Sequence, residues 1–202
     1  EYIFRKCKKE EFDITKGVSL LNKISKYDNA QAIVVSNGYS ISRTKQKYGL
    51  SLAQWSLNKM IKTKKTLNPI NFAQKASELG FNAIEYVSTL YRLELEKMNI
   101  SELTKKLISN SKNYNIKNLL IMVDQEGDLS SSNPNEILQA VNKHKKWIEM
   151  ANELGCHSVR VNLNGENNIE KWKDNSIIGL TKLCEFADNI NIIVENHGGN
   201  SS

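Results

Sequence analysis

Short runs of strand-forming residues recur along the chain at a spacing that fixes its fold class. Five runs are rich in Val, Ile, Leu and Tyr, and they are YGLSLAQW (48–55), NAIEYV (82–87), NLLIMVD (118–124), HSVRVNL (157–163) and INIIVEN (190–196). Their centres lie about 33 to 39 residues apart, which is the size of one βα unit. Strands of this composition that alternate with amphipathic helices predict a parallel sheet covered by helices.

The segments between these runs carry the start and stop signals of helices. The first helix is expected to begin at Asn68, with Pro69 in its first position, and to end at Gly80. Two others are expected from Ser101 and around residues 172–187, where apolar residues recur with a helical period.

The third helix has the clearest boundaries. Asn133 is expected to cap it, Pro134 fits its first turn, Glu136 can complete a capping box, and Gly155 ends it. Its apolar residues are predicted to face the core, and they are Ile137, Leu138, Val141, Ile148, Ala151 and Leu154.

Two architectures accept this order of elements, an open doubly wound sheet and a (β/α)8 barrel. A dinucleotide-binding doubly wound sheet needs a GxGxxG turn after its first strand, whereas this chain has AQWSLNKMI there. Because this glycine-rich turn is missing, the sequence does not favour a dinucleotide-binding fold.

The net charge of +6 belongs mainly to the start of the chain. Residues 1–47 carry ten Lys or Arg against five Asp or Glu, whereas residues 48–202 carry 18 against 17. A nucleic-acid-binding surface usually appears as clustered basic residues in the folded module itself, so no nucleic-acid partner is expected.

No run approaches the roughly 18 apolar residues of a spanning helix, so no membrane partner is expected either. The expected location is cytoplasmic, with export of a longer parent protein left open.

Residues 1–47 also lack the βα rhythm, and they are expected to form an N-terminal extension of unknown role. Residues 48–202 are expected to form the βα segment.

Ligands of parallel βα folds bind at the carboxyl ends of the strands, so the residues there are the candidates for substrate binding. Several of these strand ends carry a carboxylate. The candidates are Gln54 on the first strand, Glu85 on the second, Asp124 with Glu126 on the third, Arg160 and Asn162 on the fourth, and Glu195, Asn196 and His197 on the fifth.

These candidates differ in how strongly the pattern favours function. Glu85 and Asp124 are equally consistent with solvated or loop-capping acids. For Glu195 a functional role is favoured, because hydrogen-bonding neighbours and two glycines follow it. Arg160 either binds a sugar oxygen or phosphate, or pairs with Glu195 or Asp124. His197 either contacts substrate or Glu195, or is a loop histidine beside the glycine turn.

Five longer stretches together resemble the sugar phosphate isomerase/epimerase family, the xylose isomerase-like TIM barrels. They are YGLSLAQWSL, FAQKASELGFNAIEYV, LLIMVDQEGDL, HKKWIEMANELGCHSVRVN and IIVENHGG, and the resemblance covers residues 47–202. The pairing of LGCHSVRVN with VENHGG is its most specific part. The resemblance implies an α/β fold, a partial (β/α)8 TIM barrel of about four βα units plus a fifth parallel strand.

The resemblance also implies a metal-dependent isomerase or epimerase of a sugar, sugar phosphate or related polyol. Barrels of this family bind one divalent metal ion (Mn, Mg, Co or Zn) through a Glu on the fifth strand, an Asp on the sixth, a His on the seventh and a Glu on the eighth. By that resemblance Glu195 is a metal ligand and one of two acid/base residues that move a proton beside the carbonyl. The other three ligands are expected beyond Ser202, so the chain as given is expected to be incomplete and inactive.

Two other functions stay open. An endonuclease IV-like DNA repair nuclease of the same barrel type uses histidines at its early strand ends, where this chain has Glu85 and Asp124. A non-catalytic carbohydrate-binding barrel would lack the later metal ligands. The open strand edges of a partial barrel would also favour a homo-oligomer.

Overall fold

The computed structural model describes residues 3–5, 30–35, 38–43, 49–164 and 168–195, and its strands form two separate sheets. The first sheet is antiparallel with the strand order β1-β3-β2, and its strands are β1 (Ile3–Arg5), β2 (Ala30–Val35) and β3 (Gly38–Arg43). This sheet lies within residues 1–47, the part of the chain that lacks the βα rhythm. It has no assigned function.

The second sheet has five strands in the order β4-β5-β6-β7-β8, so each strand pairs with the strands that precede and follow it in the sequence. All four pairings are parallel. The strands are β4 (Ser51–Ala53), β5 (Ala83–Val87), β6 (Lys117–Val123), β7 (Ser158–Val161) and β8 (Asn191–Val194). Sequential parallel strands joined by helical connections are the arrangement of a (β/α)8 barrel, here a partial one of four βα units and a fifth strand, as predicted.

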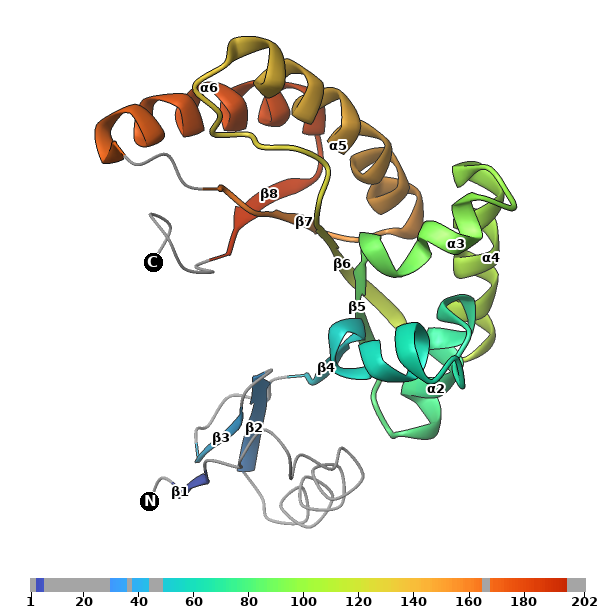
Figure 1. Cartoon of the computed structure of the whole chain (residues 1–202). Coiled ribbons are helices and arrows are strands. Elements are labelled where there is room, and N and C mark those ends of the chain that lie inside the picture. Colours follow the sequence, from blue (N-terminus) through green and yellow to red (C-terminus); the bar gives the residue numbers. More distant parts are fainter. Residues whose placement is uncertain (1–2, 6–29, 36–37, 44–48, 165–167, 196–202) are drawn as a thin grey trace.

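The four connections of this sheet are helical. The first contains η1 (Gln54–Leu57), the π-helical turn η2 (Lys59–Thr63), η3 (Pro69–Asn71) and α2 (Phe72–Glu78). The second contains η4 (Ser88–Tyr91), α3 (Arg92–Leu95) and α4 (Ile100–Asn113). The third is α5 (Pro134–Leu154) and the fourth is α6 (Ile169–Ala187). Figure 1 shows the strands as an arc with these helices on its outer side. Among the described residues, no helix combines the length and apolar character needed to cross a bilayer.

In each of the four connections, an asparagine side chain caps one helix. Asn68, Asn99, Asn133 and Asn168 each accept a hydrogen bond from a backbone N–H two or three residues later. Asparagine is among the best residues at this position, because its side-chain oxygen satisfies an N–H that has no partner within the helix. The predicted starts at Asn68 and Asn133 are confirmed, and the helix expected from Ser101 begins one residue earlier.

Two details of α5 differ from the prediction. The Glu136 carboxylate accepts a hydrogen bond from Ser131 Oγ at 2.6 Å, while the backbone N–H of Asn133 donates to the same hydroxyl at 3.1 Å. Ser131 thus takes the place that Glu136 has in a capping box. Leu138 was expected in the core and is 50% exposed, because the buried face of the helix runs through its neighbour Ile137.

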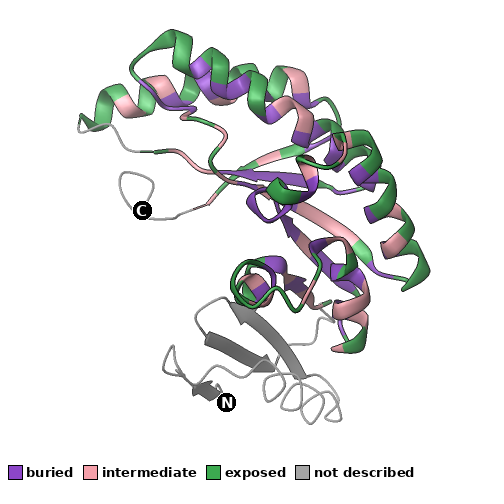
Figure 2. Cartoon of the chain, turned by 45° about the vertical axis from the view of Figure 1, so that its right-hand side comes forward, coloured by how far each residue is buried: buried purple, intermediate pink, exposed green. Residues whose placement is uncertain are grey.

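The main core lies between the sheet and its helices. On β7, Val159 and Val161 are fully buried in this core, together with Trp147 of α5. Figure 2 shows the buried residues of the long helices on the side that faces the strands. Side chains along a strand alternate between its faces, so Arg160 points away from the helices and toward the concave side of the arc. Polar residues of neighbouring strands can therefore contact one another on this concave side of the sheet.

Candidate functional site at the carboxyl ends of the strands

Three polar residues occupy the same level at the carboxyl ends of three adjacent strands. The register pairs Val123 of β6 with Val161 of β7, and Val161 with Val194 of β8. Asp124, Asn162 and Glu195 each follow one of these valines directly. The backbone N–H of Glu195 donates to Val161 O at 3.3 Å, which continues the pairing to this level. Parallel pairing therefore brings together three residues that are far apart in the sequence.

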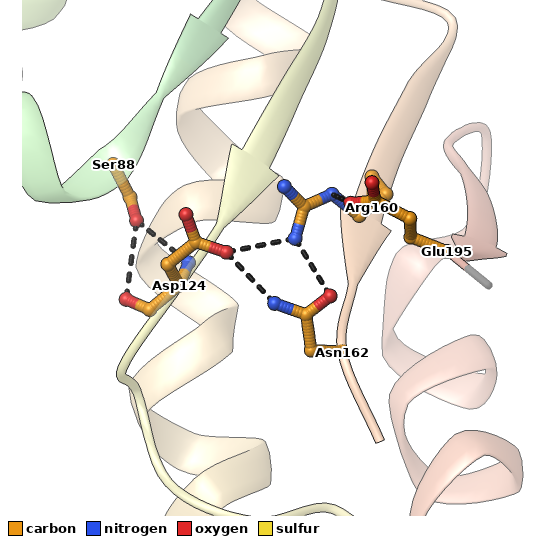
Figure 3. A network of polar contacts seen from close by, with 5 residues as sticks. All are labelled: Ser88, Asp124, Arg160, Asn162 and Glu195. Atoms are coloured by element: carbon orange, nitrogen blue, oxygen red, sulfur yellow. Dashed lines mark hydrogen bonds and ion pairs between the residues drawn. The ribbon is translucent and has the colours of Figure 1, made fainter. Parts of the chain in front are cut away.

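Arg160 connects the two carboxylates of this group. Its NH1 donates to Asp124 Oδ1 at 2.7 Å, and its Nε lies 3.0 Å from Glu195 Oε2 (Figure 3). The arginine side chain is only 11% exposed, whereas that of Glu195 is 40% exposed. A planar guanidinium can bind two carboxylates in fixed directions, which a lysine ammonium cannot do. The sequence left open whether Arg160 pairs with Glu195 or with Asp124, and in the structure it contacts both.

Asn162 completes a triangle with Asp124 and Arg160. Its Nδ2 donates to Asp124 Oδ1 at 2.8 Å, and its Oδ1 accepts from Arg160 NH1 at 2.8 Å. The amide of Asn162 therefore uses both its donor and its acceptor on residues that themselves contact each other. These two contacts hold the guanidinium of Arg160 in place independently of its contact with Glu195.

Ser88, the first residue after β5, holds the backbone of Asp124. Its hydroxyl accepts from Asp124 N at 2.9 Å and donates to Asp124 O at 3.3 Å (Figure 3). Ser88 was not among the predicted site residues, although a polar residue directly after the second strand was a usable signal. Ser88 is almost completely buried, so it belongs to the support of the site rather than to its surface.

Gln54 is fully buried at the end of β4 and binds other parts of the protein. Its Nε2 donates to Tyr91 Oη at 2.8 Å, and its Oε1 accepts from the backbone N–H of Val87 at 3.0 Å. Burial raises the pKa of Tyr91, an effect that the hydrogen bond from Gln54 partly opposes, so this phenol stays neutral. Gln54 thus joins the ends of β4 and β5, and its predicted contact with substrate stays a prediction.

Two acids near these strands lie apart from the group around Arg160. Glu85 lies within β5 rather than at its end, and it accepts a hydrogen bond from Ser51 Oγ at 2.6 Å. Glu126 accepts from Trp147 Nε1 at 2.8 Å and lies 3.0 Å from Lys146 Nζ, so it contacts α5. The role predicted for Glu85 in substrate binding stays a prediction.

The histidines within the described ranges lie away from this group. His144 is buried in α5, where its Nδ1 donates to Ala140 O at 2.7 Å, and burial lowers its pKa. His157 precedes β7, at the opposite ends of the strands. The candidate His197 lies outside the described residues, as does Asn196.

Of the four metal ligands that the resemblance implies, the described residues supply one. Glu195 offers a hard oxygen donor, partly exposed, at the end of its strand. Asp124 directs Oδ1 at Arg160 and Asn162. Within the described part of the chain, no three His, Cys, Asp or Glu side chains group as a metal site.

The chain matches the family model described as xylose isomerase-like TIM barrel over residues 73–202. A comparison with curated protein sequences gives no match. Among solved structures, the chain is similar to the IOLI protein with a bound zinc atom, with 15% identity, a TM-score of 0.57, and coverage of 73% of this chain and 51% of that one. It is also similar to D-psicose 3-epimerase from Clostridium cellulolyticum H10 with D-tagatose, with 12% identity, a TM-score of 0.55, and coverage of 70% and 50%.

A further similar structure is a D-psicose 3-epimerase in the presence of D-fructose, with 15% identity and a TM-score of 0.52. The match covers 63% of this chain and 46% of that one. The chain therefore spans about half the length of the solved structures it matches. At these identities the likeness shows the fold.

Proposed function

The chain belongs to the xylose isomerase-like TIM barrel family, and from that membership we propose that it supplies the first five strands of a metal-dependent sugar isomerase or epimerase. The substrate would be a sugar, a sugar phosphate or a related polyol. D-Tagatose and D-fructose, which accompany two of the similar structures, are the first substrates to test.

One observation carries this proposal. A carboxylate, Glu195, stands at the end of the fifth parallel strand, level with Asp124 and Asn162 and next to the guanidinium of Arg160. Catalytic residues of such barrels come from the carboxyl ends of several strands, so this position is the one a reacting group needs. The partial exposure of Glu195 leaves it accessible to a small molecule.

Glu195 would act as one of the two acid/base residues of the reaction. A divalent cation would polarise the substrate carbonyl and so acidify the adjacent C–H. Glu195 would be one oxygen ligand of this cation, and its carboxylate would accept the proton from that carbon. In an epimerase, the second acid/base residue would then deliver a proton to the opposite face of the same carbon. The Nε of Arg160 lies 3.0 Å from Oε2 of this carboxylate, and Arg160 would help to orient the hydroxyl groups of the substrate.

The complete reaction would need residues that the described part of the chain does not supply. The similar structures are about twice as long as the aligned part of this chain. We propose that three further strands bring the remaining Asp, His and Glu, either from the same polypeptide or from a partner. A ring of eight strands would then surround one cation.

Solvent deuterium tests the proposed reaction. The polypeptide that carries all eight strands, incubated with Mn²⁺ and D-tagatose or D-fructose in D₂O, should place deuterium on the carbon beside the carbonyl. Glu195→Gln should abolish this incorporation, whereas Glu149→Gln, a control at an exposed residue of α5, should keep it. Incorporation by the Glu195→Gln protein at the wild-type rate would remove Glu195 from the mechanism.

The other two functions make different demands. A DNA repair nuclease of this barrel type would need histidines at the early strand ends, where the structure has Gln54, Ser88 and Asp124. A non-catalytic carbohydrate-binding barrel would bind sugar without proton exchange. The deuterium experiment, repeated with a direct measurement of sugar binding, separates this second case from the isomerase.

A further inference from the structure

Hydrogen bonds link the carboxyl ends of all five strands of the parallel sheet. Gln54 after β4 bonds the backbone of Val87 in β5, and Ser88 bonds the backbone of Asp124. Asp124 accepts from Arg160, and Arg160 reaches Glu195. The first four side chains of this series, Gln54, Ser88, Asp124 and Arg160, are buried or mostly buried, whereas that of Glu195 is 40% exposed.

We propose that Arg160 and Ser88 are positioning residues for Glu195: Ser88 fixes Asp124, Asp124 fixes Arg160, and Arg160 sets the direction in which the Glu195 carboxylate faces. This inference rests on the proposed function in one respect, which is that Glu195 is the reacting group. The contacts among these residues can be tested without a measurement of enzymatic activity.

An isolated exposed ion pair would not hold a carboxylate in place. Such pairs contribute little, because two long side chains lose their freedom and the charges are screened by water. Here one side of the pair has already lost that freedom, since NH1 of Arg160 is bonded to both Asp124 and Asn162. Only Glu195 has to be ordered when the contact forms, so the contact persists.

Ser88 matters because a single hydroxyl satisfies two backbone groups of Asp124. Without it, the N–H and C=O of Asp124 lose their partner at the point where β6 ends. Unsatisfied backbone groups are costly unless water reaches them, so the loop that carries Asp124 would rearrange. The rearrangement would move the acceptor that fixes the guanidinium of Arg160.

The Nε–H group of Arg160 reports on this arrangement directly. The chain contains four arginines, so the arginine Nε–H region of a ¹⁵N spectrum holds few signals, and Arg160→Lys identifies the one that belongs to Arg160. We expect this signal to exchange slowly with water. Glu195→Gln, Asp124→Asn and Ser88→Ala should each accelerate the exchange at least about tenfold, the factor for losing a hydrogen bond to a charged group.

Ser130→Ala is the matched control. Ser130 is also fully buried and lies after β6, but its hydroxyl bonds Asp128 Oδ1 and Asn164 O instead of the residues around Arg160. This variant should leave the exchange of the Arg160 signal unchanged. Thermal unfolding of every variant shows which ones are folded at the temperature used, and Asp124→Asn replaces Ser88→Ala if the latter does not fold.

Three results would overturn the proposal. They are fast exchange of the Arg160 signal in the wild-type protein, unchanged exchange after Glu195→Gln, and equal effects of Ser88→Ala and Ser130→Ala. Failure of the deuterium experiment with these signals as expected would contradict the proposed reaction and leave the positioning role intact.

Discussion

The Nε of Arg160 lies 3.0 Å from Oε2 of Glu195, so a residue within β7 is joined to the residue that follows β8. The same guanidinium reaches Asp124 on the other side, after β6. One cation therefore balances two carboxylates that come from strands two positions apart in the sheet. The stability of this end of the barrel should depend on it.

Replacing Arg160 by Gln should reduce the free energy of unfolding by about 2 kcal/mol, because two carboxylates then lose their shared, mostly buried cation. Urea denaturation measures this change. Arg92→Gln is the control, since Arg92 is exposed and bonds only the side chain of Gln125 among the described residues, and its cost should stay within about 0.5 kcal/mol. Equal costs for the two variants would contradict the central place of Arg160.

Gly179 in α6 should not tolerate a side chain. A Cβ at this position would lie 2.0 Å from the carbonyl oxygen of Leu129, so the helix would have to move away from the loop after β6. We expect Gly179→Ala to destabilise the protein by about 2 kcal/mol or more, despite the better helix propensity of alanine. Gly49→Ala, where nothing lies within 4 Å of the added Cβ, should be nearly neutral in the same thermal melts.

His144 should make the protein less stable as the pH falls below about 6.5. Burial lowers its pKa in the folded protein, so the unfolded chain binds a proton that the native protein does not. The loss begins at the unfolded pKa near 6.5 and continues down to the lowered native value, with a slope of at most about 1.4 kcal/mol per pH unit. Above about pH 7.5 this group has no effect.

The slope should flatten between pH 6.5 and 5 in His144→Gln, and it should stay in His157→Gln, which changes an exposed histidine. Urea denaturation at several pH values measures both. A wild-type slope that survives His144→Gln unchanged would assign the effect to another group.

Cys184 should react with a thiol reagent in the native protein, and Cys156 should not. Cys184 is exposed, whereas Cys156 is buried and burial raises its pKa to about 12. A colorimetric thiol assay on a Cys7→Ser protein should therefore count one fast thiol, and a second one only in denaturant. Fast modification of both thiols without denaturant would show that the core around Cys156 opens.

Metal binding to the chain of 202 residues should be weak. The described residues fit a single ligand, Glu195, and a hard divalent cation needs several oxygen or nitrogen ligands. Calorimetric titration with Mn²⁺ or Zn²⁺ should give dissociation constants weaker than micromolar. Sub-micromolar binding that survives Glu195→Gln would place a metal site elsewhere in the chain.

Local signals in the sequence predicted the elements of the parallel sheet well. The βα spacing and the Asn-Pro helix starts are short-range features, because a cap needs only the next three backbone N–H groups. The first strand was predicted too long, since β4 ends at Ala53 and the next four residues turn into η1. Leu138 was placed in the core because periodicity gives the width of an apolar face only approximately.

The sequence by itself determined the parallel order of five strands and the placement of Glu195 at a strand end, since both follow from the spacing and composition of consecutive segments. Only the tertiary structure decided which side chains meet. Arg160 contacts both Asp124 and Glu195, Gln54 turns into the protein, and Ser88 supports Asp124. These contacts join residues 33 or more positions apart, and they depend on strand register and side-chain direction, which no local pattern specifies.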